Sequence, residues 1–245
     1  MKRILITGAS RGIGKSLALE IAKNEKAKFA LISKNVELLQ KVQREIQELG
    51  STSVFYSCNV GNIIELQNAI INANKFLSGV DIAVLNAGVS HNKWIFQEGY
   101  AETFEEVYRT NVFGIAYALE ILPTFMQKPG GKIVIISSLA DARGFPSSSA
   151  YSSSKAAVTK LAEAARIELK PLGIDVITVK PGFVKTDMTA KNKFPMPFLL
   201  EPDEASKIIW NGIINNRKSI QFPLPMVILT KFIAILPNSI FDFLA

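Results

Sequence analysis

Short apolar runs alternate along this chain with longer stretches whose apolar residues recur every three or four positions. The runs contain few alternating polar residues, which is typical of strands buried on both faces of a parallel sheet. Six runs are predicted to be strands: Ile4 to Ile6, Phe29 to Ile32, Val54 to Tyr56, Ile82 to Leu85, Ile133 to Ile136 and Ile174 to Val179.

The stretches between the runs are predicted to be amphipathic helices, for example from Val36 to Ile46. A repeating strand–helix order predicts an α/β fold, a doubly wound parallel sheet of the Rossmann type with right-handed crossovers and flanking helices. No internal repeat, low-complexity linker or domain boundary is visible. Residues 1–245 are therefore expected to form a single domain, a usual size for this class.

A glycine-rich loop, Thr7 to Gly14, follows the first predicted strand, and a helix is expected from Lys15 to Ala22. Glycines in such a loop allow a tight turn and a close approach of the backbone to a pyrophosphate. The helix N-terminus adds free N–H groups and a positive dipole end. Any strand–helix turn has a use for one glycine, so the position of the loop between first strand and first helix carries the prediction of a dinucleotide site.

The end of the second strand bears on the choice of dinucleotide. NAD sites usually have an acidic residue there for the ribose 2′-OH, whereas this chain has Ser33 followed by Lys34. Together with Arg11 in the glycine loop, Lys34 offers two cations to a 2′-phosphate. We therefore expect NADP(H) to be preferred over NAD(H), and the alternative is that Lys34 is an ordinary surface lysine.

Tyr151 and Lys155 lie four residues apart on a helix predicted to begin at Tyr151 and to run to about Lys170, so they share one helical face. A phenol with a pKa of about 10 is a poor acid or base at neutral pH. A neighbouring ammonium group lowers that pKa and makes the tyrosine useful for proton transfer. A Tyr and a Lys four residues apart on a helix are common, so the functional interpretation depends on the residues around them.

Several polar residues fall where the carboxyl ends of strands are expected. Ser138 ends the fifth predicted strand, thirteen residues before Tyr151, and faces the crevice in which such sheets bind ligands. Asn86-Ala87-Gly88 ends the fourth strand, and Asn111 lies on the helix that follows Arg109. Residues 181–186 end the sixth strand, where backbone groups are expected near a nicotinamide carboxamide.

Together these motifs resemble the short-chain dehydrogenase/reductase family in its classical branch, over about residues 3–190. The resemblance implies that Ser138 polarises the substrate carbonyl and that Tyr151 is the general acid/base. It also implies that Lys155 lowers the pKa of Tyr151 and binds the nicotinamide ribose, and that Asn111 holds a water linking Lys155 to solvent. The residues implied to line the dinucleotide are Gly8, Ser10, Arg11, Gly12, Ile13, Gly14, Asn86, Ala87 and Gly88, with Tyr151, Lys155, Pro181, Gly182, Val184 and Thr186 at its nicotinamide end.

The chain departs from the family pattern after the third strand, where Asn59-Val60 replaces the usual Asp-Val. In the family, the acid accepts a hydrogen bond from the adenine amino group. The side-chain oxygen of Asn59 is also an acceptor, so we expect at most weaker adenine binding and unaltered chemistry.

Composition and charge bear on the possible partners, metals and location of the protein. The net charge is +7, but no block of consecutive Lys/Arg appears, so we expect no nucleic-acid partner. A single cysteine, Cys58, and a single histidine, His91, leave too few ligands for a zinc site, and no metal is expected. No signal peptide is visible, so the expected location is cytoplasmic.

From about residue 194 the chain becomes rich in proline and bulky apolar residues, and it is most apolar after Phe222. Lys231 and Pro237 divide this tail into segments too short for a spanning helix of about 20 residues. The tail is expected either to pack on its own subunit or an oligomer partner, or to lie on a membrane or a lipid-like substrate.

Three functions remain at this point. The first is a NADP(H)-dependent reductase or dehydrogenase of a small carbonyl or alcohol, the second a non-catalytic dinucleotide-binding protein on the same fold, and the third a peripheral membrane reductase of lipid-like carbonyls. The resemblance also implies a homodimer or homotetramer that pairs through long central helices.

Overall fold

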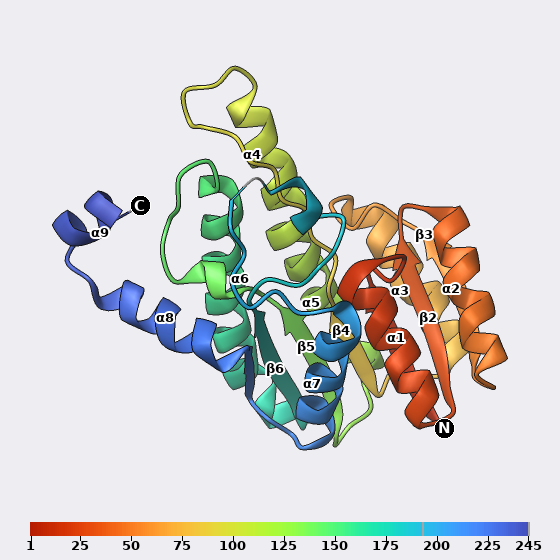
Figure 1. Cartoon of the computed structure of the whole chain (residues 1–245). Helices are drawn as coiled ribbons and strands as arrows, with labels where there is room; N and C mark the ends of the chain where they lie inside the picture. The colour runs from red at the N-terminus through yellow and green to blue at the C-terminus, as the bar shows by residue number, and fades with distance from the viewer. Residues whose placement is uncertain (193, 245) are drawn as a thin grey trace.

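The computed structural model describes residues 1–192 and 194–244. Its core is a sheet of seven parallel strands in the order β3-β2-β1-β4-β5-β6-β7 (Figure 1). The doubly wound α/β fold predicted from the sequence is confirmed. The strands are β1 (Lys2–Thr7), β2 (Ala27–Ser33), β3 (Thr52–Ser57), β4 (Ile82–Leu85), β5 (Gly131–Ile136), β6 (Ile174–Pro181) and β7 (Ser219–Phe222).

Helices cover both faces of this sheet. The principal ones are α1 (Gly12–Asn24), α2 (Val36–Glu48), α3 (Ile63–Leu77), α4 (Tyr100–Tyr108), α5 (Gly114–Phe125), α6 (Ser149–Glu168), α7 (Pro202–Ile214), α8 (Leu224–Ile235) and α9 (Asn238–Leu244). Short helical turns are η1 (Arg109–Phe113), η2 (Leu139–Asp141), η3 (Lys170–Leu172) and η4 (Thr189–Lys191).

The buried apolar side chains form two layers, one on each face of the sheet. Helices α1, α2 and α7 pack on one face, and α3, α5 and α6 pack on the other. Successive side chains of a strand point alternately into the two layers. In β1, Ile4 and Ile6 belong to one layer and Leu5 belongs to the other. Burial on both faces explains why the strands read as unbroken apolar runs.

Local sequence signals fix where the helices begin. The side chain of Asn35 accepts a hydrogen bond from the backbone N–H of Leu38 at 2.9 Å and caps α2. Asn62 caps α3 in the same way, and a reciprocal Glu201–Glu204 capping box begins α7. Each cap satisfies backbone N–H groups in the first turn of its helix.

Two helix starts and one strand differ from the sequence-based prediction. The helix after the glycine loop begins at Gly12 rather than Lys15, and α6 begins at Ser149, two residues before Tyr151. The seventh strand, β7, was not predicted, because its four residues alternate between exposed and buried and form no apolar run.

The segment after residue 194 divides into two parts. Helix α7 and strand β7 complete the sheet, and the apolar part begins only after Phe222. Helices α8 and α9 then extend away from the body of the molecule, at the left of Figure 1. Among the described residues, no helix has the length and apolar character needed to cross a bilayer.

Candidate active site

The glycine loop joins β1 to α1 at the carboxyl edge of the sheet. Gly8 and Gly12 have positive φ angles of 65° and 56°, which side chains rarely tolerate. Gly14 is in ordinary helical conformation, but a Cβ there would collide with the carbonyl oxygen of Gly8 and lie 2.5 Å from the Asn86 side-chain nitrogen. Each of these three positions therefore requires glycine for a steric reason of its own.

Asn86 holds this loop in shape. Its Nδ2 donates to the carbonyl oxygens of Thr7 at 3.2 Å and Gly8 at 3.1 Å. In return, the hydroxyl of Thr7 accepts from the backbone N–H groups of Asn86 and Ala87, at 3.0 and 3.2 Å. The structure thus brings the predicted Asn-Ala-Gly turn against the glycine loop, with Asn86 acting as its brace.

The N-terminus of α1 suits an anionic ligand. Its first turn contains no acidic side chain, and its opening N–H groups follow the glycine loop directly. Ile13 packs against the apolar layer beneath, and the hydroxyls of Ser10 and Ser33 lie 2.8 Å apart. The positive dipole end, the backbone N–H donors and the lack of a carboxylate in the first turn of α1 fit a dinucleotide pyrophosphate.

The residues predicted to choose between NADP(H) and NAD(H) lie around the end of β2. Arg11 pairs with Asp187 of the loop after β6, at 3.0 Å, and both side chains are mostly exposed. Lys34 is exposed at the rim of a cavity whose other lining residues are Asn59, Gly61, Glu102, Glu105, Glu106, Arg109 and Thr110. Glutamates therefore line the same cavity as Lys34, which the sequence did not indicate.

Asn59 and Val60 follow β3 at the same edge. The side-chain oxygen of Asn59 accepts from the N–H of Gly61 at 3.2 Å, so part of its acceptor capacity is already used. Val60 is buried beside Gly114, where a Cβ would lie 3.1 Å from its Cγ2.

The loop after β6 closes over the glycine loop. A Cβ on Gly12 would lie 3.1 Å from the methyl carbon of Thr186. The N–H of Gly182 donates to Phe222 at 2.7 Å, and Val184 forms an isolated β-bridge with Leu200. Pro181 ends the strand within 3.5 Å of the Ser138 hydroxyl. Thr186 therefore borders the glycine loop and Pro181 borders Ser138, whereas Gly182 and Val184 contact Phe222 and Leu200.

Ser138 and Tyr151 meet at the carboxyl end of β5. Ser138 is buried, and its hydroxyl accepts from the N–H of Ala140 at 3.1 Å. Burial raises the pKa of Tyr151 above its usual value, and a side-chain hydrogen bond with Ser138 acts in the opposite direction. Burial thus favours the neutral phenol of Tyr151, the form that donates a proton.

Lys155 lies beneath Tyr151 on the same face of α6. Its ammonium nitrogen donates to the carbonyl oxygen of Ile136 at 2.9 Å and lies 5.7 Å from the Tyr151 ring centre. Burial lowers the pKa of Lys155 to about 8. Gly88 leaves room beside it, since a Cβ there would lie 3.6 Å from the ammonium. The ammonium thus faces both Tyr151 and the turn after β4.

Asn111 is fully buried in the π-helical turn η1 between α4 and α5. A π-turn adds one residue to the helical circuit, and such turns are frequent at functional sites. Its side chain accepts from the N–H of Val89 at 2.8 Å, and it donates to the Val89 carbonyl and the Ser154 hydroxyl, each at 3.0 Å. Asn111 therefore fixes the turn after β4 to helix α6.

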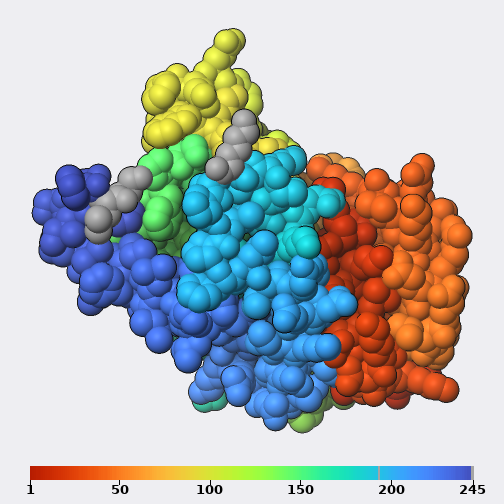
Figure 2. Space-filling view, in the orientation of Figure 1, coloured from red at the N-terminus to blue at the C-terminus, as the bar shows by residue number. Residues whose placement is uncertain are grey.

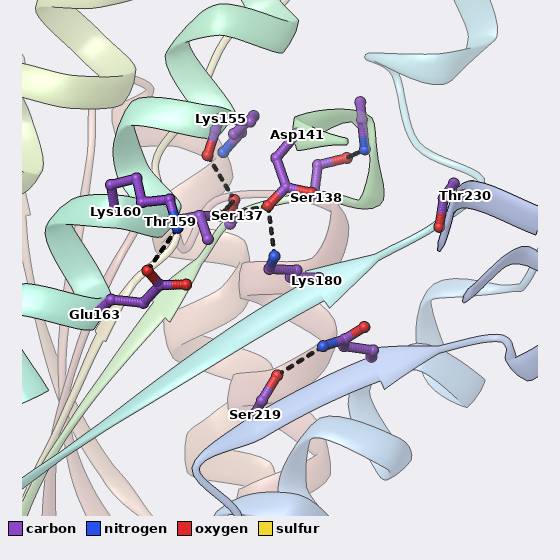
Figure 3. Close-up of polar contacts among 12 residues, drawn as sticks. Ser137, Ser138, Asp141, Lys155, Thr159, Lys160, Glu163, Lys180, Ser219 and Thr230 are labelled. Carbon is purple, nitrogen blue, oxygen red and sulfur yellow. Dashed lines mark hydrogen bonds and ion pairs between the residues drawn. The ribbon is translucent and has the colours of Figure 1, made fainter. Parts of the chain in front are cut away.

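A second polar cluster lies behind the site, and the sequence did not reveal it (Figure 3). The Ser137 hydroxyl bonds the Lys155 carbonyl at 3.0 Å and the Thr159 hydroxyl at 2.8 Å. Thr159 donates to Asp141 at 2.6 Å, and Asp141 also pairs with Lys180 at 2.6 Å. The cluster connects the residue after β5 with η2, α6 and β6. Only the i, i+4 spacing of Lys155 and Thr159 hints at it in the sequence.

The Asp141–Lys180 pair is largely withdrawn from solvent, with side chains 9% and 20% exposed. Replacing Asp141 with asparagine leaves Lys180 without a counter-charge and is expected to lower the free energy of unfolding by about 3 kcal/mol. Urea unfolding measures this loss. A second change, Lys180→Met, is expected to recover much of it, because the unpaired cation is then removed.

The exposed pair Lys160–Glu163 on helix α6 is the matched control for the buried pair. Glu163→Gln is expected to leave the unfolding midpoint nearly unchanged, since solvent already screens that pair. Equal effects of Asp141→Asn and Glu163→Gln would contradict the structural role of the buried pair.

Comparison with known proteins agrees with this geometry. The family model described as short chain dehydrogenase matches residues 2–195. An uncharacterized oxidoreductase of Myxococcus xanthus is 34% identical over 239 residues, covering 97% of this chain and 94% of that protein.

Two solved structures have a similar fold. A short chain dehydrogenase of Burkholderia cenocepacia in complex with NADP has a TM-score of 0.82 at 25% identity, covering 90% of this chain and 94% of its own. A short chain dehydrogenase/reductase of Burkholderia phymatum in complex with NAD has a TM-score of 0.86 at 20% identity, covering 94% and 92%. Both dinucleotides occur among these structures, so the likeness does not choose between them. The chain belongs to the short-chain dehydrogenase family, a family of oxidoreductases that bind a nicotinamide dinucleotide.

Proposed function

We propose that this protein transfers a hydride between NADP(H) and a carbonyl or alcohol, with Tyr151 as the general acid/base. The observation that supports this most is the convergence of Ser138, Tyr151 and Lys155 at one end of α6, beside a glycine loop shaped for a pyrophosphate. A panel of aldehydes, ketones and alcohols, followed by NADPH absorbance, tests it. Turnover of at least one carbonyl is expected, and complete inactivity would contradict it.

In the proposed reaction, each residue has one task. The dinucleotide, when bound, supplies or accepts the hydride. Ser138 donates a hydrogen bond to the substrate oxygen and polarises the carbonyl, and Tyr151 gives its proton to that oxygen. Lys155, as the ammonium, stabilises the phenolate that remains on Tyr151. Asn111 keeps the turn after β4 and helix α6 together, so that these donors stay aligned.

The lowered pKa of Lys155, about 8, predicts a pH dependence for carbonyl reduction. Below that pH the ammonium is present and supports the phenolate of Tyr151. As the pH rises through about 8, Lys155 becomes neutral and loses this effect, so kcat/KM for reduction is expected to fall. Steady-state rates at saturating NADPH, from about pH 6 to about pH 10, measure it. A kcat/KM for reduction that rises as the pH increases beyond about 8 would contradict the role assigned to Lys155.

The NADP(H) preference rests on Lys34, Ser33 and Arg11. The exposed Arg11–Asp187 pair is of a weak type, so Arg11 is free to exchange its partner for a 2′-phosphate. A charge-assisted hydrogen bond contributes about 1.5–3 kcal/mol, so Lys34→Ala is expected to lower kcat/KM for NADPH about 10- to 100-fold and leave that for NADH unchanged.

Lys26, exposed before the opposite end of β2, provides the control. Lys26→Ala is expected to change neither cofactor's kcat/KM. A wild-type enzyme that prefers NADH, or a Lys34→Ala variant that loses both cofactors equally, would contradict the preference.

We further propose that residues 1–245 act as one domain in the cytoplasm, within a homodimer or homotetramer. The exposed Phe113 beside α5 and Ile167 near the end of α6, 43% and 73% exposed, support pairing through those helices. Sedimentation equilibrium measures the assembly, and a monomer at micromolar concentration would contradict it.

A further inference from the structure

Four polar side chains form a continuous series of contacts behind Ser138 and Lys155 (Figure 3). We call them the Asp141 network: Ser137, Asp141, Thr159 and Lys180. Ser137 and Thr159 are buried, and the Asp141 side chain is almost so. An ion pair withdrawn from water adds little net stability compared with apolar side chains of the same size. Stability alone therefore does not explain why polar groups occupy this place.

The surrounding segments enclose the network. In Figure 2, only a small patch of the green segment that leads into α6 is visible, between the light blue segment after β6 and the dark blue terminal helices. The turn η2, which ends with Asp141, belongs to that green segment. Little water therefore competes for the hydrogen bonds of the network, and each of them constrains the elements that it joins.

The direction of hydrogen bonding in the network is fixed at its two ends. The Asp141 carboxylate at one end and the backbone carbonyl of Lys155 at the other can only accept. Thr159 donates its single hydroxyl hydrogen to Asp141 at 2.6 Å. Ser137 is then the donor to Thr159, 2.8 Å away, and to the Lys155 carbonyl at 3.0 Å. The carboxylate thus orients both hydroxyls and directs the Ser137 hydrogen toward helix α6.

Lys155 is thereby bound at two points to the carboxyl end of β5. Its ammonium donates to the carbonyl oxygen of Ile136 at 2.9 Å, and its own backbone carbonyl accepts from Ser137, the next residue. Thr159, one helical turn further on the same face of α6, adds a third contact with Ser137. These contacts set the position of α6 beside β5, and with it the position of Tyr151 and Lys155.

The network also holds the turn that carries Ser138. Ser138 is the N-cap of η2, and Asp141 is the last residue of that turn. Asp141 is bound to α6 through Thr159 and to β6 through Lys180. Lys180 directly precedes Pro181, whose carbonyl oxygen lies 3.5 Å from the Ser138 hydroxyl. The turn is therefore joined to both elements that flank it.

We propose that Asp141 is a positioning residue: the network that it orients keeps Ser138 at a fixed spacing from the reacting side chains of α6. This inference rests on the proposed function, because the spacing matters to a reaction at that site. Asp141 acts through Thr159 and Ser137 and takes no part in the proton or hydride transfer. Displacing a reacting group by about 1 Å can lower a rate about 100-fold, so a change in this network is expected to affect turnover.

Thr159→Val tests the proposal, because it divides the network without leaving a charge unpaired. Valine resembles threonine in shape but has no hydroxyl, so Asp141 keeps Lys180 while its connection to Ser137 is lost. We expect kcat for carbonyl reduction to fall about tenfold or more. KM for NADPH is expected to stay within about twofold of wild type, because the glycine loop is unchanged.

Two further variants show whether the hydroxyls are responsible. Thr159→Ser keeps the hydroxyl and is expected to retain kcat within about threefold of wild type. Ser137→Ala removes the neighbouring hydroxyl and is expected to reproduce the fall in kcat, with KM for NADPH again unchanged. A Thr159→Ser protein as slow as Thr159→Val would assign the effect to the packing of Thr159 and overturn the proposal.

The Arg3–Asp81 ion pair provides the control for a loss of stability. It joins β1 to the residue before β4 at the amino end of the sheet, opposite the candidate site, with an N–O distance of 2.6 Å. Asp81→Asn is expected to lower Tm at least as much as Thr159→Val and to leave kcat within about twofold of wild type. Equal losses of kcat in these two variants would reduce the network to a structural role and overturn the proposal.

NMR follows the position of Lys155 without any turnover. The cofactor-free protein is labelled with ¹³C at lysine Cε and titrated with base, and the signal that is missing from Lys155→Arg belongs to Lys155. Burial lowers the pKa of Lys155 to about 8. In Thr159→Val the ammonium is expected to gain contact with water, so its pKa rises toward the ordinary value of about 10.4. In Thr159→Ser the pKa is expected to equal that of wild type.

The outcomes separate this proposal from the proposed function. A Thr159→Val protein with wild-type kcat would overturn the positioning role of Asp141. A wild-type protein that reduces no carbonyl would overturn the proposed function, and the positioning of Lys155 would then be decided by the NMR titration. An unchanged pKa of Lys155 in Thr159→Val would in that case overturn the positioning as well.

Discussion

Replacing Tyr151 with phenylalanine is expected to lower kcat for carbonyl reduction about 100- to 10,000-fold, the range that a positioned general acid contributes. The change removes only the hydroxyl, so the ring still fills its place above Lys155. Affinity for NADPH is expected to stay within about twofold of wild type, because the glycine loop is untouched. Steady-state kinetics and fluorescence titration with NADPH measure the two quantities.

A different tyrosine serves as the control for that substitution. The hydroxyl of Tyr56 donates to the carbonyl of Asn72 at 3.0 Å, on the α3 side of the sheet. Tyr56→Phe is expected to leave kcat unchanged. If Tyr151→Phe retained wild-type kcat, the general acid would have to be another group and the proposed chemistry would be wrong.

Gly14→Ala is expected to have the second large effect. The added Cβ would collide with the Gly8 carbonyl and lie 2.5 Å from the Asn86 side-chain nitrogen, so the loop would have to shift. Overpacking of this kind costs about 1–3 kcal/mol, and the dissociation constant for NADPH is expected to rise at least tenfold, since the loop amides lose their alignment. Thermal unfolding and fluorescence titration measure both changes.

Gly144→Ala is the matched control, because a Cβ at Gly144 would meet nothing within 4 Å. Its Tm and NADPH affinity are expected to equal those of wild type. A Gly14→Ala protein with unchanged Tm and affinity would show that the loop is more adaptable than its contacts with Asn86 suggest.

The sequence was most informative where one element alone carries the signal. Unbroken apolar runs predicted six of the strands, because burial on both faces leaves a continuous pattern. The glycine loop was equally predictable, since Gly8, Gly12 and Gly14 lie within one short stretch of the chain. Strand β7 escaped prediction because four alternating residues at the edge of a sheet resemble many surface segments.

Features that depend on distant parts of the chain could not be predicted. Asp141 and Lys180 lie 39 positions apart in the sequence, and only the pairing of β5 with β6 brings them together. The same holds for the hydrogen bond from the Arg143 guanidinium to the carbonyl of Leu236 and for the glutamates that share a cavity with Lys34. The pKa of Tyr151 is a further case, because burial raises it whereas the spacing of Tyr151 and Lys155 alone suggested a lower value.

Direct transfer of deuterium is the measurement that tests the central claim best. NADPH with both C4 hydrogens of the nicotinamide replaced by deuterium is incubated with the wild-type protein and a reducible ketone, and the alcohol is analysed by mass spectrometry. The account predicts one deuterium on the carbinol carbon, with almost none from the Tyr151→Phe protein in the same time. NADPH that binds tightly while no carbonyl in the panel gains deuterium would contradict it and identify a non-catalytic dinucleotide-binding protein.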